Sequence, residues 1–385
     1  MEPQLRVLVV DDEAFNVDYL IQELEDFGVS TLSAENGVEA LKQVAEHSPD
    51  LVLLDIMMPK MDGFEVLARM KSDDTFRDIP VIIISAHSDM RHVLRGIEMG
   101  AEDYLPKPFD PLLLKARVNA SLEKKRFRNL EKEYLKGLER ELEIGRQIQT
   151  GFLPKEIVSP DGWEISAFFR AAKEVSGDFY DVIPLADDRI ALIVGDVTDK
   201  GVGAALYMAL YRSLLRAYLS SNGFVGDTTR NGLSEAAAFV NNYICRVHHS
   251  VMYLTAFMAI LDPSSGKLTF VSAGHDFPLV VRGNGDIEEL KPTGPAIGIL
   301  EDRVFGRGEI RLEAGDGLLA YTDGLLDIRN SAGKSFGAQK LRDLVGKETQ
   351  GVGTLIAGIV SQVDDFSAGT VQYDDVTMLG ISRSA

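Results

Sequence analysis

Residues 51–63 read LVLLDIMMPKMDG, a short apolar run that ends on an aspartate and leads into a turn. An uninterrupted apolar run of this length is typical of a strand that is buried on both faces of a parallel sheet. Pro59 fixes its own backbone φ angle and Gly63 relaxes the chain, so residues 58–63 are expected to turn before a helix. The stretch therefore predicts a buried strand with Asp55 at its carboxyl end.

Four further short apolar runs flank this one, separated by segments such as FNVDYLIQELEDFG in which apolar residues recur at helical spacing. The runs are LRVLVV (5–10), STLSA (30–34), VIIIS (81–85) and EDYLP (102–106). This alternation predicts an α/β doubly wound fold, with a five-stranded parallel sheet and helices on both faces. Functional residues of such a fold gather at the carboxyl ends of the strands.

Polar residues suited to phosphoryl chemistry stand at that end of the predicted sheet. Asp11 and Asp12 end the first strand, Asp55 the third and Ser85 the fourth, while Lys107 follows the fifth. One such residue alone is usually a helix cap or a solvated side chain, but five at one rim point to a site. Clustered carboxylates repel one another unless a hard divalent cation neutralises them, which implies Mg²⁺. The set suits phosphoryl transfer onto a carboxylate.

The stretches VVDDE, LLDIMMPKMDG, IIISA and YLPKPF resemble the receiver domain of two-component response regulators, over residues 1–120. The resemblance implies that Asp55 accepts a phosphoryl group from a cognate sensor histidine kinase, and that Lys107 and Ser85 contact that group. It implies that Tyr104 switches rotamer when Ser85 moves, although an ordinary strand aromatic is the alternative. The implied Mg²⁺ ligands are Asp11, Asp12, Asp55 and the backbone carbonyl of Met57.

Residues 121–153 are rich in Glu, Lys, Arg and Leu and contain no proline, so they are expected to form a helical linker. Apolar positions alternate at three- and four-residue steps, which is the seam of a coiled coil. The seam is Leu135, Leu138, Leu142, Gly145, Gln149 and Phe152, of which Gly145 and Gln149 are poor seam residues. We expect a parallel homodimer through these helices; a single solvated spacer helix is the alternative.

After Pro154 the pattern changes to successive strand-like runs with hairpin-like spacers. The runs are WEISAFFR, RIALIVGDV, TAFMAILD, LTFVSAG, PLVV and DDVTMLGIS, and they bracket helical stretches at 202–219 and 233–247. This order predicts antiparallel sheets packed against helices, an α+β layered sandwich, over residues 154–385.

Aspartate recurs beside glycine or at strand ends in this last region, in SGDFYD, GDVTDKG, YTDG and QYDDVT. A single instance is usually an Asx turn, but four in one domain are harder to dismiss. The region contains no G-x-S-x-G motif and no cysteine paired with a plausible base. An all-oxygen site favours Mg²⁺ or Mn²⁺ over zinc, and two such ions can hold a hydroxide in line with a phosphorus atom.

These stretches, together with IGRQIQTGFLP and SAGH, resemble the SpoIIE-type branch of the PPM, or protein phosphatase 2C-like, serine/threonine phosphatases over about residues 140–385. The resemblance implies an αββα sandwich with two Mn²⁺ or Mg²⁺ ions, bridged by Asp196. It implies that Asp178 acts mainly through metal-bound water, and that metal-activated water hydrolyses phosphoserine or phosphothreonine without a phosphoenzyme. The remaining implied ligands are the carbonyl of Val197, Asp323 and Asp374.

The chain departs from that family's usual pattern at two positions. Asp199 stands where glycine is usual, and Gly203 where proline is frequent. Asp199 can bind an accessory metal, cap the following helix or hinder the site electrostatically, and we favour capping. For His275 in SAGHDFP, a structural hydrogen bond and a catalytic role are equally open.

The whole chain is thus expected to be a cytoplasmic response regulator in which phosphorylation of Asp55 controls a phosphatase. The substrate implied by resemblance alone is a phosphorylated anti-sigma factor antagonist of the STAS type. The alternative is a non-enzymatic, RssB-like adaptor that binds a sigma factor or an anti-sigma partner through a phosphatase-like domain, but such adaptors lose the metal-binding aspartates.

Composition argues against two other classes of partner. Lys and Arg number 40 against 59 Asp and Glu, and the net charge of −19 repels nucleic acid and anionic membranes. No apolar run approaches the roughly 20 residues that cross a bilayer, and the first residues do not resemble a secretion signal.

Overall fold

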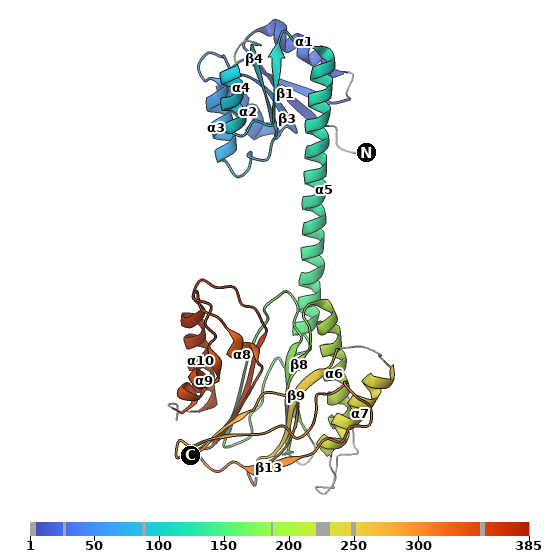
Figure 1. The fold of residues 1–385 in the computed structure, drawn as a ribbon, viewed down its shortest axis with the longest axis vertical. Helices are drawn as coiled ribbons and strands as arrows, with labels where there is room; N and C mark the ends of the chain where they lie inside the picture. Colours follow the sequence, from blue (N-terminus) through green and yellow to red (C-terminus); the bar gives the residue numbers. More distant parts are fainter. Residues whose placement is uncertain are drawn as a thin grey trace. The chain divides into compact units, whose positions relative to one another are not determined.

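The computed structural model describes residues 5–25, 28–86, 90–185, 188–220, 232–247, 252–346 and 351–384. The chain divides into two compact units, Met1–Leu138 and Glu139–Ala385 (Figure 1). The boundary between the units lies within helix α5 (Pro111–Thr150), which is continuous over most of the expected linker.

The first unit is built on a parallel sheet of five strands in the order β2-β1-β3-β4-β5. This is the strand order of one common doubly wound fold, and it confirms the expected fold class. The strands are β1 (Arg6–Val10), β2 (Ser30–Ala34), β3 (Leu51–Asp55), β4 (Val81–Ala86) and β5 (Asp103–Lys107). The helices before α5 are α1 (Ala14–Glu25), α2 (Gly37–His47), α3 (Gly63–Ser72) and α4 (Met90–Glu98).

Strand β3 is apolar throughout because helices cover both faces of the sheet. Leu51 and Leu53 pack in one core with α1 and the start of α5, whereas Val52 and Leu54 pack in another with α2 and α3. Successive side chains of a strand point to opposite faces, so each face receives every second residue. The carboxylate of Asp55 is thereby carried to the end of the sheet.

The second unit contains two antiparallel sheets, in the orders β13-β10-β9-β8-β7 and β12-β11-β14-β15-β6. Their longer strands are β6 (Trp163–Arg170), β7 (Asp178–Pro184), β8 (Ile190–Val197), β9 (Leu254–Asp262), β10 (Lys267–Ala273) and β15 (Val376–Arg383). The shorter strands are β11 (Leu279–Val281), β12 (Ile287–Glu289), β13 (Gly308–Arg311) and β14 (Gly317–Tyr321).

Helices cover the outer face of each sheet in this unit (Figure 1). The first sheet packs against α6 (Val202–Ser220) and α7 (Gly232–Val247). The second packs against α8 (Gly324–Asp327), α9 (Gly337–Val345) and α10 (Val352–Ser367). A third core lies between the two sheets. The expected αββα layered sandwich is confirmed.

The end of α5 corrects one part of the predicted coiled-coil seam. Leu135 and Leu138 are 50% and 44% exposed, as an unpartnered seam would be. Gln149, in contrast, is buried against the second unit's own backbone at Ser176. Its assignment to the seam was wrong, because the apolar spacing does not reveal which face of the last turn the rest of the domain covers.

None of the helices in the described ranges combines the length and apolar character that a bilayer-spanning helix needs.

Candidate functional site

Three carboxylates gather at the carboxyl end of the parallel sheet. Asp11, Asp12 and Asp55 each offer an oxygen, and these three oxygens lie within 4.8 Å of one another. Asp11 and Asp55 are buried, while Asp12 is exposed. The Nζ atom of Lys107 lies 2.8 Å from an oxygen of Asp11 and 3.2 Å from an oxygen of Asp55. One lysine thus contacts two of the three carboxylates of this acidic pocket.

Burial raises the pKa of Asp55 to about 6; Lys107 opposes this shift and Asp11 adds to it. Burial also disfavours the charged form of Lys107, but its bonds to Asp11 and Asp55 outweigh burial and raise the lysine's pKa. The pocket therefore has more negative charge than its lysine balances. A hard cation with oxygen ligands fits this donor set.

The remaining expected residues of the first unit lie around this rim. Ser85 is buried, near the end of β4, and Lys107 is the last residue of β5. The half-buried ring of Tyr104 lies under the guanidinium of Arg117, at 4.8 Å. The side chain of Met57 is 71% exposed in the turn after β3. A Cβ atom at Gly63 would collide with the carbonyl oxygen of Asp55, so glycine is needed where the turn closes on the strand.

The second candidate site forms where the two antiparallel sheets end beside each other. Asp178 of β7 and Asp196 of β8 are partners in the strand register, and Asp196 also pairs with Thr255 of β9. Asp323 lies two residues after the end of β14, and Asp374 lies two residues before the start of β15, two neighbouring strands of the other sheet. The structure thus brings together four aspartates that lie far apart in the sequence.

Asp178 ties the two sheets together. It is buried, and its Oδ2 atom accepts hydrogen bonds from the hydroxyls of Thr322 and Thr377, both at 2.7 Å. Burial raises its pKa well above the usual value, and the charge of Asp196 adds to the effect. The sequence reasoning missed both threonines, although each belongs to a quoted motif, YTDG and DDVT.

The carboxylates of this site repel one another. Burial raises the pKa of Asp196 to about 7, and the charges of Asp323 and Asp374 add to this. The pKa of Asp323 is raised by its partial burial and then by Asp374. Lys200 contributes one positive charge, 2.9 Å from Asp374. The excess negative charge and all-oxygen donor set fit hard divalent cations.

The spread of these carboxylates also distinguishes the two sites. In the described ranges, the acidic pocket of the first unit is the one place where three His, Cys, Asp or Glu side chains offer ligand atoms within 4.8 Å of one another. The second site is wider, which suits a pair of ions better than a single ion.

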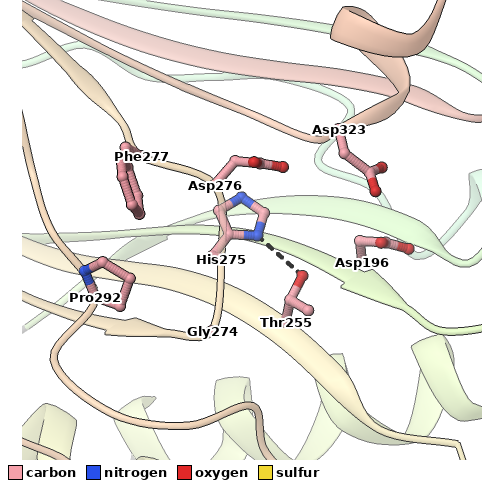
Figure 2. A pocket seen from close by; sticks show the side chains of 8 residues that line it. All are labelled: Asp196, Thr255, Gly274, His275, Asp276, Phe277, Pro292 and Asp323. Atoms are coloured by element: carbon pink, nitrogen blue, oxygen red, sulfur yellow. Dashed lines mark hydrogen bonds between the residues drawn. The ribbon is translucent and has the colours of Figure 1, made fainter.

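A pocket of about 370 Å³ opens beside Asp196 and Asp323. Figure 2 shows the carboxylate of Asp323 pointing toward Asp196, with His275 between Asp276 and Thr255. The Nδ1 atom of His275 lies 3.1 Å from the hydroxyl of Thr255. Burial lowers the pKa of His275 to about 4, so its imidazole is neutral at physiological pH.

Asp276 is an acidic residue of this pocket that the sequence reasoning missed. Burial raises its pKa to about 6, and the charge of Asp323 adds to the shift. Its position directly after the SAGH motif was the available signal.

Two other recurrent aspartates serve the fold. Asp181 is fully buried and pairs with Arg212 at 3.0 Å and Arg216 at 2.6 Å, which attaches α6 to β7. Asp375 accepts hydrogen bonds from the backbone of Ala172 and Gly177 and from the hydroxyl of Ser176. These carboxylates are therefore satisfied by cations or donors of the protein itself.

Asp199 does not cap α6 as expected. Its carboxylate accepts a hydrogen bond from the N–H of Lys200, at 2.8 Å, whereas the helix begins at Val202. Its φ angle is +76°, in the left-handed region that favours glycine. The backbone of this turn explains why glycine suits the position.

Comparisons with known proteins agree with this division into two units. A family model described as "Stage II sporulation protein E (SpoIIE)" matches residues 186–384, and one described as "Response regulator receiver domain" matches residues 7–119. Protein IcfG of Synechocystis sp. is 36% identical over 264 residues, which cover 63% of this chain and 42% of IcfG. The probable transcriptional regulator ycf27 of Guillardia theta is 41% identical over 122 residues, which cover 32% of this chain and 47% of that protein.

The chain spans less than half the length of these two relatives. Among solved structures, the SiaA-PP2C domain of Pseudomonas aeruginosa aligns with a TM-score of 0.55 and 22% identity, covering 66% of this chain and 99% of that domain. At that identity the likeness concerns the fold.

Proposed function

The chain belongs to the SpoIIE family and carries a receiver domain ahead of its phosphatase-type domain, and on this premise we propose that phosphorylation of Asp55 controls a metal-dependent protein serine/threonine phosphatase. The domains themselves are those of a response regulator with a PPM-type phosphatase as its output. The single observation that supports catalysis best is the convergence of Asp178, Asp196, Asp323 and Asp374 from two sheets.

The residues that would hold two Mn²⁺ or Mg²⁺ ions are Asp196, Asp323, Asp374, the carbonyl of Val197 and, mainly through water, Asp178. Such ions supply an activated water for attack on the phosphorus of a phosphoserine or phosphothreonine. Lys200 offsets part of the charge at Asp374, and Thr322 and Thr377 orient Asp178 by their two hydroxyl hydrogen bonds.

Direct hydrolysis without a phosphoenzyme is inferred from the family resemblance. Apart from the carboxylates, Thr255 and His275 are the lining residues in the described chain that carry nucleophilic atoms. These two bond to each other, and the burial of His275 favours its neutral form. We therefore assign His275 the role of holding Thr255 and the pocket wall in place.

In the receiver domain, Asp55 would accept the phosphoryl group from a sensor histidine kinase. Mg²⁺ would be held by Asp11, Asp12, Asp55 and the carbonyl of Met57. The contact between Lys107 and the Asp55 carboxylate supports a contact with a phosphoryl group there. Ser85 and Tyr104 would then act as the switch pair.

The proposed substrate is a phosphorylated anti-sigma factor antagonist of the STAS type, an inference from the family resemblance. A non-enzymatic, RssB-like adaptor is the competing function. The presence of all four aspartates in one site favours the enzyme, because an adaptor has no use for buried carboxylates that repel one another.

The test is Mn²⁺-dependent release of phosphate from a phosphorylated STAS-domain protein. Asp196→Ala and Asp374→Ala should each lower turnover by roughly 100-fold or more, because each removes a metal ligand. Asp365→Ala, at an exposed position of α10, is the matched control and should behave as wild type. Equal turnover in the wild type and both site variants would favour the adaptor.

A further inference from the structure

Gln149, in the last turn of α5, bonds to the segment between β6 and β7. Gln149 is buried, and its amide makes two hydrogen bonds to the backbone of a single residue, Ser176. Its Nε2 atom donates to the Ser176 carbonyl at 2.6 Å, and its Oε1 atom accepts from the Ser176 N–H at 2.9 Å. A buried amide that lost these partners would leave two unsatisfied polar groups, so the pair resists separation.

Ser176 also bonds to residues at the aspartate site. Its hydroxyl donates to Asp375 at 2.7 Å and accepts from the N–H of Asp178 at 3.0 Å. The same oxygen of Asp375 also accepts from the N–H of Gly177 at 3.0 Å. A continuous chain of buried hydrogen bonds therefore runs from Gln149 to the backbone of Asp178.

The segment that carries this connection has no regular secondary structure of its own. Residues 171–177 connect β6 to β7 without forming a helix or a strand. Gly177 packs against the Val197 carbonyl so closely that a Cβ atom would collide with it, and its own carbonyl accepts from the Val197 N–H at 3.3 Å. The segment thus lies beside a proposed metal-ligating carbonyl as well as before Asp178.

We propose that Gln149 is a positioning residue for the metal site. Its amide holds Ser176, and through Ser176 it holds Asp178 and the Gly177–Val197 contact in the arrangement that binds metal. Because Gln149 belongs to α5, a rotation or shift of that helix end has to move or break this pair. The inference rests on the proposed function, since it takes Asp178 and Val197 as part of the metal site.

The position explains why a glutamine stands in a helix stretch whose spacing suggests an apolar seam. A leucine or methionine there would fill the same space but could not bond to both backbone groups of Ser176. A purely packing role does not require the amide, whereas a positioning role does.

The test uses the full chain with Gln149→Met, which keeps the length of the side chain and removes the amide. Gln147→Met is the matched control, because Gln147 is exposed on the same helix turn and bonds to Glu143 of the same helix. Calorimetric titration with Mn²⁺ should show affinity lowered by about tenfold or more in Gln149→Met and unchanged in the control. Unchanged Mn²⁺ affinity in a folded Gln149→Met protein would overturn the proposal.

Ser176→Ala provides an independent test. It keeps the two backbone groups that bond to Gln149, and it removes the hydroxyl that bonds to Asp375 and to the N–H of Asp178. If the connection acts as one unit, the losses of Mn²⁺ affinity in the two single variants should not add in the double variant. Additive losses would mean that Gln149 acts only on the fold. If Gln149→Met fails to fold, Ser176→Ala alone provides the test. This variant should bind Mn²⁺ more weakly than the wild type. An unchanged Mn²⁺ affinity would contradict the proposed connection from Gln149 through Ser176 to Asp178.

Hydrogen exchange of the Gly177 and Asp178 amides separates this inference from the proposed function. Both amides should exchange faster in Gln149→Met, with or without Mn²⁺, and unchanged exchange would contradict the inference. Absence of Mn²⁺ binding in the wild type would instead refute the proposed function, while the exchange result would still decide the role of Gln149.

Discussion

At the scale of single residues, the aspartate site is held in an electrostatically unfavourable state by burial. Asp178 and Asp196 face each other across two strands, and burial raises the pKa of both. The fold tolerates this because Thr322 and Thr377 donate to Asp178. A site of this kind trades stability for the ability to bind cations, which can be measured directly.

Asp196→Asn should stabilise the metal-free protein more at pH 8 than at pH 5. The pKa of Asp196 is about 7 in the folded state, above the ordinary value of 3.8, so the folded protein binds this proton more tightly. Its ionisation therefore removes stability as the pH rises from the ordinary value to about 7, and asparagine avoids that loss. The advantage of the variant should grow by about 3 kcal/mol between the two pH values.

The measurement is urea unfolding in the presence of a chelator, followed by tryptophan fluorescence. Trp163 is the one tryptophan of the chain and is buried in the second unit, so its signal reports on that unit. A pH-independent difference between the variant and the wild type would contradict a pKa of Asp196 raised by burial.

Asp199 provides a second test at this scale. Because its φ angle is +76°, Asp199→Gly should be more stable than Asp199→Ala by about 1 kcal/mol. The same fluorescence assay compares the two variants. Equal stabilities of Asp199→Gly and Asp199→Ala would contradict this prediction, because the left-handed backbone would then carry no cost for alanine.

At the scale of elements, the aspartate site depends on how two sheets are joined. The hydroxyl of Thr377 donates to Asp178, and the N–H of Thr377 donates to the hydroxyl of Thr322. The bonds from Thr322 and Thr377 to Asp178 connect the second sheet to β7, an edge strand of the other sheet. The relative placement of the sheets thereby sets the distances between carboxylates.

Thr322→Val should weaken Mn²⁺ binding by about tenfold, because it removes one donor to Asp178 while keeping the shape of the side chain. Thr269→Val in β10 is the control, since Thr269 is only partly buried and lies in the middle of its strand. Calorimetry on the full chain checks this. Equal affinities in the two variants would show that Asp178 does not need this donor.

Over the whole chain, α5 is the covalent connection between the receiver domain and the SpoIIE-type domain. Leu135 and Leu138 are exposed on it, and we expect them to pair with the same residues of a second copy. Leu138→Glu should therefore lower the mass measured by analytical ultracentrifugation from dimer to monomer. Lys136→Glu, on the same helix, should leave the mass unchanged; a monomeric wild type would support the single spacer helix.

Phosphorylation of Asp55 should also change the phosphatase activity of the second unit. With Mg²⁺ and acetyl phosphate present, the rate of phosphate release from the phosphorylated STAS-domain protein should change by at least about fivefold, since regulatory coupling is usually about 1–3 kcal/mol. Asp55→Asn should abolish that change while keeping the basal rate. An identical response in the variant would mean that acetyl phosphate acts elsewhere.

Much of this protein followed from the sequence, because strand periodicity and turn residues are local properties. The strand ends alone predicted that Asp11, Asp55, Ser85 and Lys107 share one rim, since parallel strands end at the same edge of a sheet. The aspartate motifs of the second domain could likewise be recognised from short stretches, and the structure brings these motifs to one place.

The groups that support those aspartates could not be predicted, because they depend on contacts between distant parts of the chain. The bonds from Thr322 and Thr377 to Asp178 join residues 144 and 199 positions apart, and the bonds of Gln149 to Ser176 span 27 positions. Such contacts depend on the register of strands and on which face of a helix is covered. Neither is encoded in local spacing, so Gln149 resembled a weak seam residue until its buried partner was seen.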